Sequence, residues 1–183
     1  MIEAIEIAIM SGDGNGKCKG VTKDSRIPAG NIITVTSANI GKWAEWKKNV
    51  FAKMKKAYRR GEFVFAQGTF DSYIDGMVDT TGQPIGRVNY GIDGEEIYRF
   101  GGKDVLTVEE NILPTFDDAE TGDIFGVFID WNNYAINSNL EMAIIRWTDH
   151  DENTEKTKAI MIVDGKLLDP FGVLLLKKGG GGA

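Results

Sequence analysis

The sequence predicts an α+β fold, with helices early in the chain and strands late. Apolar residues recur at helical spacing in residues 2–10, 42–60 and 69–78. From residue 105 onward, short apolar runs alternate with turns rich in Gly, Asn and Asp. Strands and helices do not alternate strictly, as they would in a parallel α/β sheet, so the two kinds of element are expected to be segregated.

The first element is an amphipathic helix, because Ile2, Ile5 and Ile9 fall on one helical face. No capping residue or lead-in turn precedes it, so we expect the chain to begin inside an element of something longer. The helix is expected to end in residues 11–16, where alternate glycines supply backbone angles that other residues resist.

An apolar stripe along residues 42–60 predicts the longest helix, and Gly61 follows where a left-handed C-terminal residue belongs. The β-branched residues 32–36 are expected to form a strand. Residues 63–66 are continuously apolar, which predicts a strand buried on both faces. A shorter helix is expected over residues 69–78.

The second half of the chain is expected to be mostly strands. The predicted strands span residues 105–108, 124–129, 141–147, 158–163 and 167–176. Asp164-Gly165 stands between two apolar runs and predicts a hairpin turn. The glycine-rich residues 179–183 are expected to be disordered.

Composition narrows the class of protein. The chain has 183 residues, of which 42% are hydrophobic and 26% charged, and its net charge is −6. An acidic chain is unlike an electrostatic nucleic-acid binder. One cysteine and one histidine leave little for a zinc site. No apolar run approaches the roughly 20 residues of a membrane span, and no basic signal-peptide segment opens the chain. We therefore expect a soluble, intracellular protein that is not a metalloenzyme.

Residues 12–17 (GDGNGK) resemble a phosphate-binding loop. The spacing is one residue short, Cys18 replaces the magnesium-binding Ser or Thr, and a helix precedes the loop where a strand is required. Asp13 also begins a run like a calcium loop, but the required glycine and glutamate are out of register. A turn that ends the helix is the favoured interpretation.

Two charged clusters have both a functional and a structural interpretation. A group of acidic residues could attract a hard cation or form a solvated loop; it comprises Asp117, Asp118, Glu120 and Asp123. A basic group lies in the last two turns of the predicted long helix, where the helix dipole favours cations; it comprises Lys53, Lys55, Lys56, Arg59 and Arg60. A patch that binds phosphate or an acidic partner, or a contact with another subunit, is the alternative for the basic group.

No set of residues predicts catalysis. His150 lies in an acidic run without an accompanying Ser or Cys nucleophile motif, so an exposed loop is favoured. A pair of carboxylates for glycoside hydrolysis stays open, because 27 acidic residues always offer pairs. The four tryptophans could form a sugar platform, although Trp43 and Trp46 belong to a predicted core stripe. We predict no catalytic, cofactor-binding or metal-binding residue.

Five segments in order resemble the major capsid protein of tailed bacteriophages and prophages, which has the Hong Kong 97-type fold. They lie in residues 8–21, 57–84, 98–105, 122–136 and 163–177. The most specific is Val163-Asp164-Gly165-Lys166-Leu167-Leu168-Asp169-Pro170 near the C-terminus. The sequence departs from the family at Lys19, near a frequent proline, and at Val127, where an aspartate is usual.

The resemblance implies a division of the chain. Residues 1–18 would be the end of the family's spine helix and a glycine loop, left from the peripheral domain. Residues 19–154 would form the axial domain, which gathers around capsomer centres. Residues 155–178 would be strands that return to the peripheral domain, and 179–183 a flexible tail. The family's N-terminal arm and E-loop would lie before this chain, so we expect a truncated form that cannot assemble a full shell.

The resemblance also implies a function. The chain would be a structural subunit of an icosahedral phage head, with no enzymatic activity and no cofactor. The full-length protein would self-associate into pentamers or hexamers, with other phage head proteins as further partners, and without tight nucleic-acid binding or membrane contact. It would reside in the virion, and in the host cytoplasm before assembly. The alternatives are an encapsulin-type compartment shell, a carboxylate-dependent hydrolase, and a monomeric binding module that uses the basic group.

Overall fold

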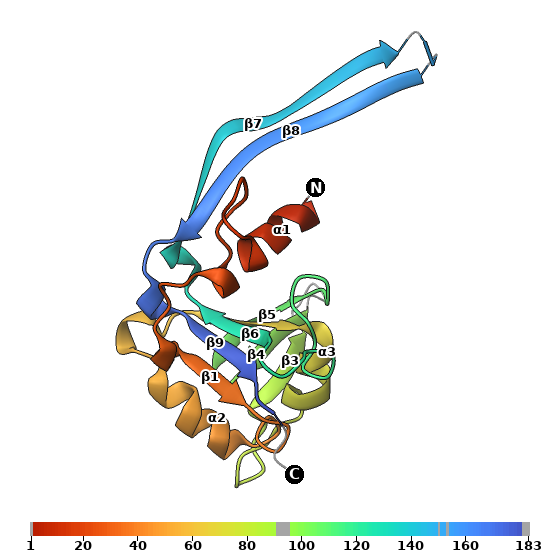
Figure 1. The fold of residues 1–183 in the computed structure, drawn as a ribbon. Helices are drawn as coiled ribbons and strands as arrows, with labels where there is room; N and C mark the ends of the chain where they lie inside the picture. Colours follow the sequence, from red (N-terminus) through yellow and green to blue (C-terminus); the bar gives the residue numbers. More distant parts are fainter. Residues whose placement is uncertain (1, 91–95, 150, 153, 181–183) are drawn as a thin grey trace.

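The computed structural model describes residues 2–90, 96–149, 151–152 and 154–180. It shows a sheet packed between helices, with a long two-stranded hairpin that projects from this body (Figure 1). The helices are α1 (Ile2–Ser11), α2 (Trp43–Asn49) and α3 (Gln67–Thr69). The strands of the body are β1 (Ile32–Val35), β2 (Glu62–Ala66), β3 (Gly86–Tyr90), β4 (Glu96–Phe100), β5 (Lys103–Val108), β6 (Ile124–Ile129) and β9 (Leu174–Lys178). The hairpin consists of β7 (Tyr134–Asp149) and β8 (Thr154–Leu167).

The body is a seven-stranded mixed sheet in the order β1-β9-β6-β2-β5-β4-β3. Among the strand pairs that the structure describes, only β1–β9 and β2–β5 are parallel. β2 lies in the middle, where Phe63 is paired with Val105 on one side and Phe128 on the other. All residues of β2 except Glu62 are buried, which confirms the prediction of a strand covered on both faces.

Each face of the sheet has its own core, because successive side chains of a strand point to opposite faces. On one face Phe63 and Phe65 pack with Trp46 of α2 and with Phe100. On the other face Val64 belongs to a cluster with Met10, at the end of α1. The sheet is therefore covered by α2 on one side and by α1 on the other.

The prediction of one helix over residues 42–60 is wrong in its extent. α2 ends at Asn49 and is followed by 3₁₀ turns at Phe51–Lys53 and Lys56–Tyr58. The centre of the Phe51 ring lies 5.6 Å from the centre of the Phe63 ring and 5.7 Å from that of the Phe100 ring. This packing against the core favours a bend over further helix, because tertiary packing routinely overrides local propensity.

The helix predicted over residues 69–78 begins earlier and is irregular. α3 continues into a π-helical turn at Phe70–Ile74, closed by a 2.8 Å hydrogen bond from the Asp75 amide to the Phe70 carbonyl. Gly76 follows with a φ of +73°, which L side chains rarely adopt, and the helix therefore stops before Val78.

Four predicted strands are confirmed in the sheet, namely residues 32–36, 63–66, 105–108 and 124–129, with small differences at their ends. β3 and β4 were not predicted. The segment 167–176 is not one strand, because Pro170 begins a 3₁₀ turn, Pro170–Gly172, that separates β8 from β9. Gly179 is buried and donates a 2.8 Å hydrogen bond to the Val35 carbonyl, so the disorder predicted for the tail is wrong at this residue; residues 181–183 lie outside the described part.

The hairpin differs most from expectation. The predicted strands 141–147 and 158–163 are parts of β7 and β8, which pair from Tyr134 and Leu167 out to Asp149 and Thr154. The turn predicted at Asp164-Gly165 is wrong, since Gly165 pairs with Ile136 inside the ladder. A Cβ at Gly165 would lie 2.9 Å from the Tyr134 ring, so this glycine serves a close packing contact.

Candidate assembly surfaces

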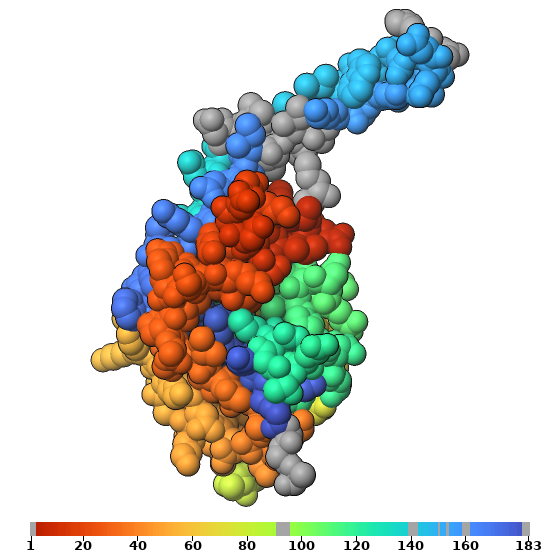
Figure 2. All heavy atoms as spheres, viewed as in Figure 1, coloured from red at the N-terminus to blue at the C-terminus, as the bar shows by residue number. Residues whose placement is uncertain are grey.

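The hairpin exposes large apolar side chains to an unusual degree. Figure 2 shows it as a narrow arm that leaves the body of the molecule. Among its described side chains, the large apolar ones that are exposed are Ile136, Ile144, Ile145, Trp147 and Ile162. Trp147 is 45% exposed. Ile144 and Ile145 are consecutive and therefore face opposite sides of the strand, so both faces of the arm carry apolar surface.

The hairpin also has two edges along which no third strand pairs within the described residues. Within the described residues, β7 and β8 pair only with each other. A two-stranded ribbon is marginally stable by itself in water, and its unpaired amides and carbonyls form a template for further contacts. An arm with these properties gains stability when another surface covers it.

The base of the hairpin is held by a group that we call the base clamp: Lys19, Asp24, Arg26, Tyr134 and Leu167. The Lys19 amide donates to the Gly165 carbonyl (2.6 Å), and the Tyr134 hydroxyl donates to the Lys19 carbonyl (3.0 Å). The Arg26 guanidinium donates to the Leu167 carbonyl (2.6 Å) and pairs with Asp24 (2.6 Å). The loop after α1 therefore fixes the position at which the arm leaves the body.

Two groups at the base have displaced pKa values. The hydrogen bonds from Arg26 hold the pKa of Asp24 below its ordinary value, against the opposing effect of burial. Burial raises the pKa of the Tyr134 phenol, and the neighbouring Cys18 adds to this effect. Both displacements favour the forms that the base clamp needs: a carboxylate that accepts and a neutral hydroxyl that donates.

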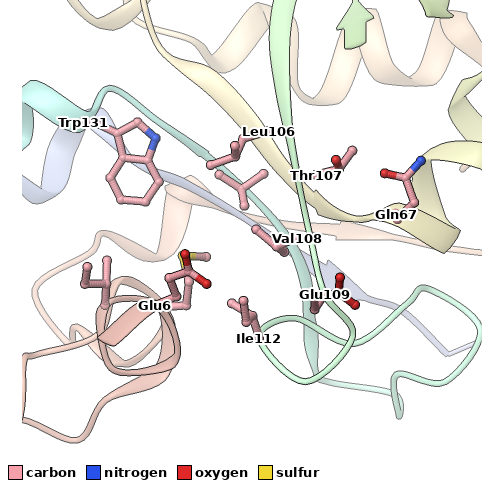
Figure 3. Close-up of a pocket in the computed structure, with 11 residues that line it drawn as sticks. Glu6, Gln67, Leu106, Thr107, Val108, Glu109, Ile112 and Trp131 are labelled. Atoms are coloured by element: carbon pink, nitrogen blue, oxygen red, sulfur yellow. The ribbon is translucent and has the colours of Figure 1, made fainter. Parts of the chain in front are cut away.

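A second surface is an apolar groove of about 440 Å³ between α1 and the sheet (Figure 3). Its apolar lining includes Ile9 of α1, Leu106 and Val108 of β5, Ile112 and Trp131. Leu106 is 43% exposed although its partner Val64 is fully buried. Glu6 and Glu109 also line the groove, and both residues are exposed. The groove therefore combines an apolar floor with acidic side chains.

The structure places residues 12–17 in a turn, as the favoured interpretation predicts. α1 ends at Ser11, and the chain returns so that Asp13 and Lys19 form a bridge. A Cβ at Gly12 would collide with the Cys18 carbonyl, so this glycine is required for the close return of the chain.

The acidic loop residues are directed to separate local partners. Asp118 accepts from the Thr115 hydroxyl (2.6 Å), Asp117 from Tyr73 (2.5 Å), and Asp123 from the Glu120 amide (3.0 Å). Among the described residues, no group of three or more His, Cys, Asp or Glu side chains is placed to hold a metal ion. His150 lies outside the described residues.

The basic group lies beyond the helix that was expected to carry it. Because α2 ends at Asn49, its dipole does not account for Lys53 to Arg60. Lys55 instead lies 4.6 Å from the centre of the Phe171 ring, and Lys103 donates to the Arg59 carbonyl. These basic residues thus lie in the turns that join α2 to β2.

The tryptophans divide between the core and the two surfaces. Trp46 is buried and Trp43 packs against the same core, as predicted. Trp131 lines the groove and Trp147 lies on the arm, so the four do not form one platform. No helix in the described part of the chain has both the length and the apolar character of a membrane span.

Comparison with known proteins identifies the family of the chain. The sequence model of the phage capsid family matches residues 1–178. The chain belongs to the phage capsid family. No curated protein matches this capsid-family chain.

Solved capsid structures have the same fold. The capsid of an empty GTA particle, computed with C5 symmetry, has a TM-score of 0.72 and 20% identity, over 97% of this chain and 62% of that one. The capsid of the native GTA particle has a TM-score of 0.70 and 20% identity, over 97% of this chain and 61% of that one. A protein of Gordonia phage Cozz has a TM-score of 0.52 and 16% identity, over 97% of this chain and 59% of that one. The predicted α+β, Hong Kong 97-like fold is confirmed, and the chain spans about three fifths of the length of these structures.

Proposed function

We propose that this capsid-family chain is a structural subunit of a phage head and acts by associating with copies of itself. The observation that carries the proposal is the projecting hairpin, which is apolar on both faces and, within its described residues, has no third strand along either edge. A shell subunit requires such an extended contact surface. Closed rings of five or six copies are the capsomers that this function requires, and other head proteins are further partners.

The same proposal covers where the subunit resides and whether it has catalytic activity. The subunit resides in the virion, and in the host cytoplasm before assembly. It performs no catalysis and requires no cofactor. Its net charge of −6 repels nucleic-acid phosphates, which suits a container whose packaged DNA slides freely. The encapsulin-type and hydrolase alternatives gain no specific support from the groove or the arm.

We further assign the seven-stranded sheet to the axial domain, and α1 with the hairpin to the peripheral remnant. This assignment modifies the sequence-based division in two places. A boundary at residue 154 would separate the two strands of one hairpin. β9 pairs with both β1 and β6, so it belongs to the sheet.

The test shortens the arm without disturbing the body. Residues 139–162 are replaced by Asn-Gly, a two-residue turn that joins the paired residues Ser138 and Val163. Sedimentation equilibrium should show association of the wild-type chain and its loss in the short-arm variant, with the same melting temperature of the body. Equal association of the two proteins would refute the role of the hairpin.

A further inference from the structure

The outer part of the arm, residues 145–149 and 154–158, which we call the tip, combines apolar and charged side chains on one face. Ile145 and Trp147 are two residues apart in β7 and so point to the same side. They pair across the ladder with Lys158 and Lys156. Lys156 is held by Asp149 (2.6 Å) and Glu152 (2.9 Å), whereas Lys158 lies directly opposite Ile145.

The groove presents the complementary combination. Its floor is apolar, formed in part by Leu106, Val108 and Trp131, and Glu6 and Glu109 supply negative charge (Figure 3). Leu106 is exposed because α1 covers the middle of the sheet and leaves the α1-facing side of β5 open. An apolar residue with a cation beside it therefore matches the groove in both polarity and charge.

We propose that the tip of one copy docks in the groove of a second copy, with Trp147 on the apolar floor and Lys158 facing Glu109. The proposal rests on the proposed function of self-association and specifies its contact. A buried tryptophan at the centre of an interface is a frequent energetic hot spot.

The contact must be made between copies. The 14 residues of β8 extend about 45 Å at roughly 3.3 Å per residue. The arm points away from the sheet (Figure 1), so the tip of a chain does not reach the groove of the same chain. Because the tip and the groove are different surfaces, the contact is head-to-tail. Repeating it produces a closed ring when the rotation that relates neighbouring copies is a whole fraction of a full turn.

Disulfide trapping tests the proximity. Two variants in a Cys18→Ala background, Lys158→Cys and Glu109→Cys, are mixed in a glutathione buffer, and mass spectrometry measures the mixed dimer. The control replaces Glu109→Cys by Glu120→Cys, an exposed acid on another loop. We expect at least a fivefold excess of the Lys158–Glu109 dimer over the control.

Charge reversal tests the energetics. Lys158→Glu and Glu109→Lys should each raise the dissociation constant of self-association at least tenfold, and the double variant should restore it. Trp147→Ala should weaken association as much, whereas Glu120→Lys should leave it unchanged. Circular dichroism checks that each exposed substitution preserves the fold.

The outcomes separate this contact from the proposed function. Self-association with equal trapping at Glu109 and Glu120, or with no effect of charge reversal, overturns the tip–groove contact and leaves the function standing. A chain that stays monomeric at every concentration and gives no trapped dimer above the control overturns both.

Discussion

The Arg26 guanidinium donates a 2.6 Å hydrogen bond to the Leu167 carbonyl, at the residue where the long arm ends. The same guanidinium makes an ion pair with Asp24, whose side chain is only 3% exposed. One short loop thereby connects the buried core of the body to the base of the arm.

Arg26→Ala is expected to destabilise the protein by about 1.5–3 kcal/mol, because it leaves the buried Asp24 carboxylate without its charged donor. The free energy of unfolding is measured by urea denaturation. Arg99→Ala is the matched control. Its ion pair with Asp104 (3.1 Å) is exposed and contributes at most about 1 kcal/mol. Equal losses in the two variants would contradict the special role of Arg26.

Stability should fall in acid partly through Asp24. The folded-state pKa of Asp24 lies below its ordinary value of 3.8, so its carboxylate stabilises the fold above about pH 4. That contribution is lost as pH falls through the lower, folded-state pKa. Asp24→Asn should lower the free energy of unfolding at pH 7 and reduce its dependence on pH below 4. A variant with the wild-type slope would exclude Asp24 as a source of acid lability.

Gly165→Ala is expected to cost about 1–3 kcal/mol, because the added methyl group would lie 2.9 Å from the Tyr134 ring. Gly41→Ala provides the control, since a Cβ there meets no atom within 4 Å. The melting temperature should fall in Gly165→Ala and stay close to the wild-type value in Gly41→Ala. If the two alanine variants melt together, the packing explanation for Gly165 fails.

Phe100→Ala is expected to destabilise the body by about 3–5 kcal/mol, because its ring is fully buried within 5.0 Å of Trp46 and 5.5 Å of Phe63, centre to centre. Tyr90→Ala, at a residue that is 74% exposed, should change stability by no more than about 0.5 kcal/mol. A small loss at Phe100 would show that the aromatic cluster contributes little to the stability of the body.

The sequence predicts the buried strands well and the arm poorly. Phe63-Val64-Phe65-Ala66 has a continuous apolar pattern that is typical of a doubly covered strand. In the arm, Ile144 and Ile145 break the alternation expected of a half-buried strand, because both of its faces lie outside the core. Asp164-Gly165 has the composition of a turn, but the Tyr134 ring determines its role, and that contact joins residues about 30 positions apart in the chain.

Long-range contacts also explain the other differences. The groove brings Glu6, Leu106 and Trp131 together from three separate elements, and no local motif marks any of them. The bend after Asn49 arises because Phe51 packs against Phe63 and Phe100. Family resemblance predicted the fold correctly, since it integrates such contacts over the whole chain, whereas periodicity reports only on neighbours.

The most direct test of self-association is sedimentation velocity of the wild-type chain over a concentration series, with negative-stain electron microscopy of the same samples. The proposed function predicts a species that grows with concentration and appears as rings of five or six copies. A single monomeric species at every concentration, without rings, would contradict it.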